Sequence, residues 1–490
     1  MKKTGIDLVT DIQNPSPDYY CTWQTQLFAT SDGKPENQRR AICERSLFDT
    51  QFPYGWAYFY EQARRDLFLV MDDSWDVPLS NDGAYFGSLL LDEQKFPTFT
   101  KNTDNPLSPL VSKLKGLGWK GLGLWVCAQE SPLYSVDKSE EEYWVERFCK
   151  MKEAGVSYWK VDWGAKALSV EFRKMLTSLA KTHAPNLIVE HSLIKEIIPF
   201  THTFRTYDVP SIMSIPMTLE KLVSFTLQDD QQMKYDNIIN CEDEAYIAAA
   251  GGYAMGIMRH PYAQNLPDGR EDMSFPNFHR KIKTKMYEII RAARWHRIAP
   301  AFSGGSFSVS ETVLSDSWKF IRPEIEIEDW WFNVSMVKDF ITDGVLTKSA
   351  PAIIARNTQL PKVSYDKSGN ICYCIASQNP NGVYSVATLG RTSNQEYFLP
   401  KCDVEIYTKN ADTIGIFGEY SSLTAVTDAT FDKVFMQDLA DDESFDVTEH
   451  IIRQDNRIII SGDLISQIGR LAQPDGDTSE PGVLLKLIKK

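Results

Sequence analysis

Short apolar runs alternate with amphipathic stretches from about residue 20 to residue 300. Strand candidates occupy residues 20–26, 66–73, 121–127, 158–163, 187–192, 203–209, 237–241 and 253–258. Apolar residues at helical spacing predict helices over residues 139–155, 169–184, 216–228 and 277–298. Repeated alternation of strand and helix predicts an α/β fold with a closed (β/α)8 TIM barrel. An open doubly wound sheet is the alternative, but no GxGxxG motif follows an early strand.

The pattern changes after about residue 345, where helical spacing fades. Strand-like pieces follow, among them residues 361–366, 370–377, 383–390, 404–409, 414–420, 457–465 and 482–488. Turn signals such as NPNG and DKSGN separate them, which is typical of an antiparallel β-sandwich. We therefore divide the chain into a catalytic barrel (15–310), a connection (311–345) and a C-terminal β-sandwich domain (346–490).

Charge and composition narrow the choice of partners. The net charge of −14 argues against nucleic acid and against an anionic membrane surface. No apolar run is long enough to span a membrane, and residues 1–20 lack the apolar core of a signal peptide. We expect a cytoplasmic protein, or an exported one whose signal peptide is absent from this sequence. The oligomeric state stays open.

The eight cysteines form no CxxC motif, and several lie in apolar runs. We expect small buried hydrophobic residues rather than a disulfide framework or a metal site. His183, His191, His202 and His260 also lack the spacing of metal ligands, although a barrel metallohydrolase stays open as a minor alternative. We predict neither a metal nor a cofactor.

Charged and aromatic residues gather at the predicted strand ends. They are Trp23 on the first strand, Asp72 and Asp73 on the second, Trp125 on the third, Lys160 and Asp162 on the fourth, Glu190 on the fifth, and Arg205 and Asp208 on the sixth. The chemistry of a TIM barrel lies at the C-terminal ends of its strands. Carboxylates that accept from hydroxyls, beside rings that cover apolar faces, suit a sugar ligand.

Four motifs in order carry a resemblance to a known family group. They are "VMDDSWD" (70–76), a later "KFP" (95–97), "LKGLGWKGLGLWV" (114–126) and "YWKVDWG" (158–164). The region from about residue 20 to 260 resembles the α-galactosidase clan of retaining glycoside hydrolases, families 27 and 36, the melibiase-like enzymes. The resemblance implies a TIM barrel, a C-terminal β-sandwich and a double-displacement mechanism.

The resemblance also implies roles for single residues. It makes Asp162 the nucleophile and Asp208 the general acid/base. It has Asp72 and Asp73 hold sugar hydroxyls, Lys160 and Arg205 contact the sugar or orient carboxylates, Glu190 read the 2-position of the sugar, and Trp23 and Trp125 line the pocket. Three features depart from the family. Arg205 and Asp208 are separated by two residues instead of three, Trp163-Gly164 stands where family 27 has a disulfide-linked cysteine, and the segment after residue 240 has no clear match.

The residues support the nucleophile independently. Lys160 and Asp162 share a face of the pleat, and a nearby ammonium favours the ionised carboxylate that a nucleophile requires. Three alternatives stay open. Lys160 and Asp162 could form a structural pair, Asp208 could cap the loop before Pro210, and Glu190 could serve as the acid/base.

We therefore expect an exo-acting retaining glycoside hydrolase that cleaves terminal α-galactosides or the related β-L-arabinopyranosides, with an oligosaccharide or glycoside as substrate. An α-N-acetylgalactosaminidase of the same clan is a second reading, although Glu190 beside His191 leaves less room for an N-acetyl group. A non-catalytic sugar-binding barrel is the alternative from another class.

Overall fold

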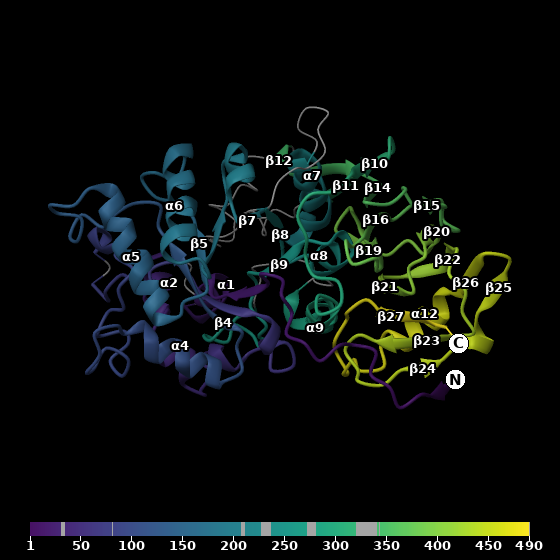
Figure 1. The fold of residues 1–490 in the computed structure, drawn as a ribbon, viewed down its shortest axis with the longest axis horizontal. Coiled ribbons are helices and arrows are strands. Elements are labelled where there is room, and N and C mark those ends of the chain that lie inside the picture. Colours follow the sequence, from purple (N-terminus) through teal and green to yellow (C-terminus); the bar gives the residue numbers. More distant parts are fainter. Residues whose placement is uncertain are drawn as a thin grey trace.

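Eight parallel strands close into a barrel, seen in the half of Figure 1 coloured purple to teal. The computed structural model describes residues 1–30, 35–80, 82–206, 211–226, 237–271, 281–319, 341–342 and 344–489. The barrel strands are β2 (Tyr19–Cys21), β3 (Phe68–Met71), β4 (Gly121–Val126), β5 (Tyr158–Val161), β6 (Ile188–His191), β7 (Thr203–Arg205), β8 (Ile238–Glu242) and β9 (Ala254–Ile257). They pair in chain order, and β9 pairs back to β2. The predicted (β/α)8 barrel is confirmed.

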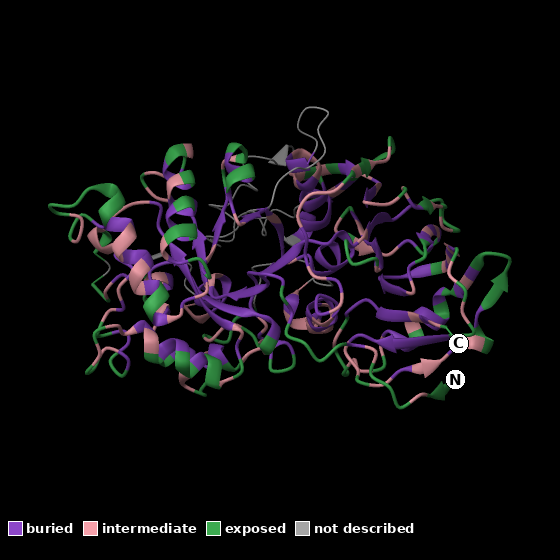
Figure 2. Ribbon diagram, in the orientation of Figure 1, coloured by how far each residue is buried: buried purple, intermediate pink, exposed green. Residues whose placement is uncertain are grey.

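Helices surround the barrel; most of them have an exposed outer face, whereas the strands are buried (Figure 2). They are α1 (Trp23–Thr30), α2 (Pro35–Ala41), α3 (Glu44–Phe48), α4 (Leu107–Gly116), α5 (Glu140–Ala154), α6 (Val170–His183), α7 (Ser214–Thr226), α8 (Ala245–Gly251) and α9 (Met286–Trp295). A 3₁₀ helix, η4 (Lys195–Phe200), follows β6. Helix α5 begins where predicted, because Ser139 and Glu142 form a capping box, and it ends at Gly155 in the left-handed region.

The first predicted strand, 20–26, is wrong beyond Cys21. The carbonyl of Thr22 accepts from the backbone N–H of Gln26 at 2.8 Å, so the chain turns directly into α1. Thr22 Oγ1 also donates to Gln26 Oε1 at 2.7 Å. The alternating polar residues that resemble a strand are therefore buried partners of a helix start, and Trp23 is the first residue of α1.

The barrel interior has an apolar layer with a charged layer above it. Tyr19, Cys21, Phe68, Val70, Tyr158 and Met258 form the apolar layer. Gly123 lets β4 approach this layer, because a Cβ there would lie 2.7 Å from Val70. Strands end earlier than predicted, so Asp72, Asp73 and Asp162 begin the loops at the C-terminal mouth.

The C-terminal domain is built from two large sheets that face one another across an apolar core, mostly with antiparallel pairing. A nine-stranded sheet runs β1 (Lys2–Lys3), β24 (Phe445–Asp446), β23 (Lys433–Asp438), β27 (Gly482–Ile488), β21 (Thr413–Phe417), β17 (Tyr384–Leu389), β16 (Tyr373–Gln378), β14 (Ile353–Arg356) and β10 (Phe307–Val309). A five-stranded sheet runs β15 (Lys362–Val363), β20 (Cys402–Lys409), β22 (Tyr420–Thr427), β26 (Arg457–Ser461) and β25 (Ile452–Gln454). Ile406 and Leu423 of the smaller sheet meet Ile416 and Leu485 of the larger one in this core.

Some strand boundaries in this domain differ from prediction. The strand predicted at 457–465 stops at Ser461, whose side chain caps helix α12 (Gly462–Ile468). The strand predicted at 414–420 stops at Phe417, because Gly418 has a φ of +89° and turns the chain toward β22. Within the predicted connection, β11 (Val313–Lys319) pairs with β13 (Val345–Pro351), while 320–340 and 343 lie outside the described residues.

Helix α8 packs between the barrel and the large sheet (Figure 1). Its small residues permit this contact, because a Cβ at Gly251 would lie 2.9 Å from Ile375 and one at Gly252 would lie 2.0 Å from Phe302. Ser377 of β16 donates to the carbonyl of Ala250 at 2.7 Å. The glycine- and alanine-rich segment therefore serves close packing. All eight cysteines, each in the described part of the chain, are free thiols, and six of them are buried.

Candidate active site

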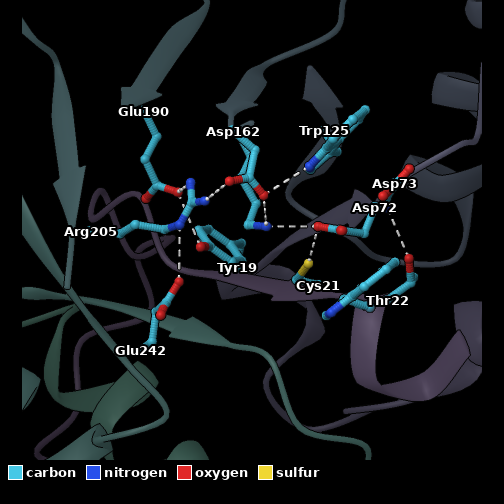
Figure 3. A network of polar contacts seen from close by, with 12 residues as sticks. Tyr19, Cys21, Thr22, Asp72, Asp73, Trp125, Asp162, Glu190, Arg205 and Glu242 are labelled. Atoms are coloured by element: carbon cyan, nitrogen blue, oxygen red, sulfur yellow. Dashed lines mark hydrogen bonds and ion pairs between the residues drawn. The ribbon is translucent and has the colours of Figure 1, made fainter. Parts of the chain in front are cut away.

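Asp162 lies at the centre of a buried charge network at the barrel mouth (Figure 3). Lys160 Nζ is 2.8 Å from Asp72 Oδ2 and 3.6 Å from Asp162 Oδ2. On the other side, Arg205 Nη2 is 2.8 Å from Asp162 Oδ1. Trp125 Nε1 donates to Asp162 Oδ2 at 2.9 Å. The structure thus brings together five of the predicted residues, from four different strand ends.

The cations keep Asp162 ionised. Burial on its own would raise the pKa of Asp162, but the opposing charges of Arg205 and Lys160 and the Trp125 hydrogen bond outweigh burial and lower it. The Asp162 side chain is 11% exposed, whereas Lys160 is 2% and Arg205 1% exposed. Of these three, the carboxylate is therefore the group nearest to solvent. Lys160 and Arg205 both lie against carboxylates, which is one of the two roles predicted for them.

Glu190 lies deeper than predicted. Tyr158 donates to its Oε2 at 2.7 Å, Asn240 donates to the same oxygen at 2.8 Å, and Tyr19 donates to Oε1 at 3.1 Å. Arg205 Nη1 adds an ion pair at 3.5 Å. The side chain has no exposed surface. The donors hold the Glu190 carboxylate inside the barrel. The roles expected of it, reading the 2-position of a sugar and the acid/base alternative, stay predictions.

Strands β5 and β8 supply further polar residues of the network that sequence reasoning missed. Tyr158 precedes Lys160 by two residues, and Asn240 precedes Glu242 by two, so each pair points to the same side of its strand. Glu242 Oε1 lies 3.1 Å from Arg205 Nε. The sequence contained a signal for them. Residues two apart in a strand point to the same side, and the spacing that linked Lys160 to Asp162 also links Tyr158 to Lys160 and Asn240 to Glu242.

Asp72 and Asp73 differ in their surroundings. Cys21 Sγ donates to Asp72 Oδ2 at 2.8 Å, and burial together with the Asp72 charge raises the pKa of the thiol, which stays protonated. Asp73 accepts from Ser74 at 2.6 Å and lies 3.7 Å from Arg39. Burial raises the pKa of Asp73 to about 6 despite Arg39. Asp73 therefore titrates near neutrality.

Aromatic rings border the carboxylates. Trp125 packs against Trp163 with ring centroids 5.4 Å apart, and Phe86 lies edge-on to Trp163 at 5.0 Å. The Arg39 guanidinium lies 5.6 Å from the Trp163 centroid. Trp23 is half-buried and packs against the apolar layer of the barrel. Trp163, which sequence reasoning noted only as a departure from the family, is the partly exposed ring beside Asp162.

Arg173 of α6 fixes the turn that carries Asp162. Its guanidinium donates to the carbonyls of Asp162 at 2.8 Å and Ala167 at 2.7 Å. It also contacts His191 Nδ1 at 3.1 Å, and burial followed by the charge of Arg173 lowers the pKa of His191 well below its usual range. His191 therefore stays neutral.

Asp208, the predicted acid/base, lies outside the described residues. Among the residues that the structure does describe, no cluster of three or more His, Cys, Asp or Glu side chains is arranged to hold a metal ion. Within the same part of the chain, no helix combines the length and the apolarity needed to cross a membrane.

Comparisons with known proteins give the following matches. No family model matches the sequence, and no curated protein matches it significantly. A variant of a family 27 β-L-arabinopyranosidase from Geobacillus stearothermophilus, solved with arabinose, is similar in structure at 11% identity, with 97% of each chain covered and a TM-score of 0.43. A putative α-galactosidase from Bacteroides fragilis matches at 10% identity over 97% of this chain and 80% of its own, with a TM-score of 0.42.

An α-amylase from Geobacillus thermoleovorans, solved with acarbose, matches at 8% identity over 98% of this chain and 100% of its own, again with a TM-score of 0.43. The arabinopyranosidase and the α-amylase, which differ in specificity, therefore have the same TM-score to this chain. At these identities and TM-scores the likeness does not assign an activity, which must come from the residues of this chain.

Proposed function

We propose that this protein is an exo-acting retaining glycoside hydrolase of the α-galactosidase clan, which cleaves terminal α-galactosides by double displacement. The observation that carries the proposal is the environment of Asp162. Two buried cations and an indole N–H hold its carboxylate ionised at the barrel mouth, as a nucleophile that attacks a sugar requires.

The mechanism assigns distinct tasks to the charged residues. Asp162 attacks the anomeric carbon to form a glycosyl-enzyme, and water then cleaves this intermediate. Asp208 is proposed as the acid that protonates the leaving oxygen and as the base that activates the water; this role rests on the family resemblance. Asp72 and Asp73 are proposed to accept from sugar hydroxyls, with Trp163 and Trp125 beside the ring. Lys160 and Arg205 keep Asp162 charged and oriented.

A panel of nitrophenyl glycosides tests the function. We expect turnover of the α-galactoside or the β-L-arabinopyranoside and little turnover of the α-N-acetylgalactosaminide. NMR should show the product formed first with retained configuration at the anomeric carbon. An inverted product, or no turnover of any glycoside in the panel, contradicts the proposal.

Asp162→Ala tests the nucleophile. We expect the variant to lose at least about 1000-fold in kcat, because the covalent intermediate cannot form. Azide should restore turnover and yield a glycosyl azide of inverted configuration, since one displacement then replaces two. Glu196→Ala, which removes an exposed carboxylate from η4 after β6, is the control and should retain wild-type kcat. Retained turnover in Asp162→Ala would remove Asp162 from the mechanism.

A further inference from the structure

Glu242 ends strand β8 with its side chain turned into the barrel. It is 2% exposed, and its Oε1 lies 3.1 Å from Arg205 Nε. Asn240, two residues earlier on the same side of the strand, donates to Glu190 at 2.8 Å. Neither the predicted nucleophile nor the predicted acid/base comes from this strand, yet both of its inward polar residues contact the network around Asp162.

The backbone after Glu242 is fixed by several bonds. Asp243 has a φ of +59°, a conformation that costs a non-glycine residue energy and persists only where the surroundings impose it. Its carboxylate accepts from the N–H groups of Met258 at 2.8 Å and Arg259 at 3.2 Å, and its own N–H donates to the carbonyl of Gly256 at 2.8 Å. The end of β8 is thereby tied to β9, and the Glu242 carboxylate has little freedom to leave Arg205.

Arg205 links Glu242 to Asp162. Its three nitrogens face three carboxylates, with Nε on Glu242, Nη1 on Glu190 and Nη2 on Asp162 (Figure 3). The guanidinium is planar and rigid, so a partner on Nε determines where Nη2 points. Arg205 is also the strongest of the groups that lower the pKa of Asp162 against burial.

We propose that Glu242 is a positioning residue for the reaction: it holds Arg205 so that Nη2 lies on Asp162, and it neutralises part of the charge that Arg205 directs at the nucleophile. This inference rests on the proposed function only in treating Asp162 as the nucleophile. Among the described residues, the Glu242 carboxylate acts on Asp162 through Arg205.

Three variants of the 490-residue chain separate this role from simple support of the fold. Glu242→Ala removes both the charge and the oxygen that lies beside Arg205 Nε. Glu242→Gln keeps an amide oxygen at that position and removes only the charge. Glu244→Ala is the matched control, since Glu244 is also buried, lies two residues away and contacts Ser214. The measurements are crystal structures, melting temperatures, and kcat and KM against pH on the aryl glycoside.

We expect the Nη2–Oδ1 distance between Arg205 and Asp162 to increase beyond about 3.5 Å in Glu242→Ala. Its kcat should fall about 30-fold or more with KM changed less than about threefold, because orientation in the transition state is lost. Glu242→Gln should retain the contact and most of kcat. The acidic limb of its kcat/KM profile should move to lower pH by about half a unit. Without the negative charge of Glu242, the positive charge of Arg205 acts more strongly on Asp162 and lowers its pKa further. Glu244→Ala should change neither the distance nor the limb.

The proposal is overturned if Arg205 keeps its place in Glu242→Ala, or if Glu242→Ala and Glu244→Ala lose kcat equally. Should Glu242→Ala fail to fold, Glu242→Gln decides, and an acidic limb at its wild-type position overturns the proposal. If the wild-type protein hydrolyses no glycoside, the proposed function fails, while the crystal structures still decide whether Glu242 positions Arg205.

Discussion

Single carboxylates in this protein differ in ionisation because their neighbours differ. Asp162 faces two cations, whereas Asp76, four residues after Asp72, is buried with its main partner a backbone N–H, that of Leu89 at 3.1 Å. Burial raises the pKa of Asp76 to about 7, and the nearby charge of Asp73 adds to this. The same residue type thus serves as an anion at one position and, at the other, as a group that exchanges a proton near pH 7.

Asp76→Asn should change how stability depends on pH. The folded pKa of Asp76, about 7, lies above the ordinary value of 3.8, so the folded protein retains a proton that the unfolded chain releases between these values. The protonated Asp76 therefore adds to the free energy of unfolding below about pH 4, and this stabilisation is lost as the pH rises through 7. Asn keeps the acceptor for Leu89 and carries no charge. We therefore expect equal melting temperatures near pH 4 and a more stable variant at pH 8.

Calorimetry from pH 4 to 8 measures this difference. Asp104→Asn, which alters an exposed carboxylate before α4, should follow the wild-type curve at every pH. A constant difference between Asp76→Asn and the wild-type protein across this range would contradict the raised pKa.

At the scale of elements, helix α6, which follows β5 in the chain, helps to hold the turn that carries Asp162. Helix α6 packs against β6, and its Arg173 reaches back to the carbonyls of the turn that begins with Asp162. The helix was predicted from apolar spacing, and in the structure Ser169 caps it. The role of Arg173 was not predicted, because its acceptors are backbone atoms, which carry no signature in a sequence.

Arg173→Lys should impair catalysis without loss of positive charge. A lysine ammonium cannot span the carbonyls of Asp162 and Ala167 as the planar guanidinium does. We expect kcat to fall about tenfold or more, because small displacements of a reacting group are costly. Lys174→Met, on the exposed side of the same helix, is the control and should retain kcat. Equal kcat in the two variants would contradict a role for Arg173 in holding the turn.

At the scale of the whole molecule, the barrel and the β-sandwich share a buried interface. Arg291 of α9 binds Asp438 of β23 through Nε at 2.8 Å and Nη2 at 3.0 Å, and neither side chain is exposed. The N-terminal strand β1 pairs with β24, so the chain begins and ends in the same sheet (Figure 1). The domain therefore supports the barrel through α8 and α9.

Arg291→Met should destabilise the protein strongly. It leaves the Asp438 carboxylate buried without its cation, which typically costs about 3–5 kcal/mol. Arg294→Met on the same helix is the matched control. Arg294 pairs with Asp442, whose side chain is 80% exposed, and such pairs contribute about 1 kcal/mol or less. Denaturant unfolding measures both, and equal losses would contradict the difference between buried and exposed pairs.

The local pattern of apolar and polar residues was sufficient to predict many of the strands and helices of the barrel. All eight barrel strands and the helices α5 and α6 follow from apolar periodicity and capping residues, which act between near neighbours in the chain. The charged residues at the strand ends could also be found from the sequence. Once a closed barrel is predicted, the C-terminal ends of its strands are expected to meet at one mouth.

Tertiary structure decided what each charged residue faces. Glu190 and Asp162 look alike as carboxylates at neighbouring strand ends, yet one is enclosed by Tyr19, Tyr158 and Asn240 while the other lies nearer the barrel mouth. These partners lie from 32 to 171 residues from Glu190 in the chain. Depth within the barrel and the choice of ion-pair partner depend on such distant contacts, so no local pattern could determine them.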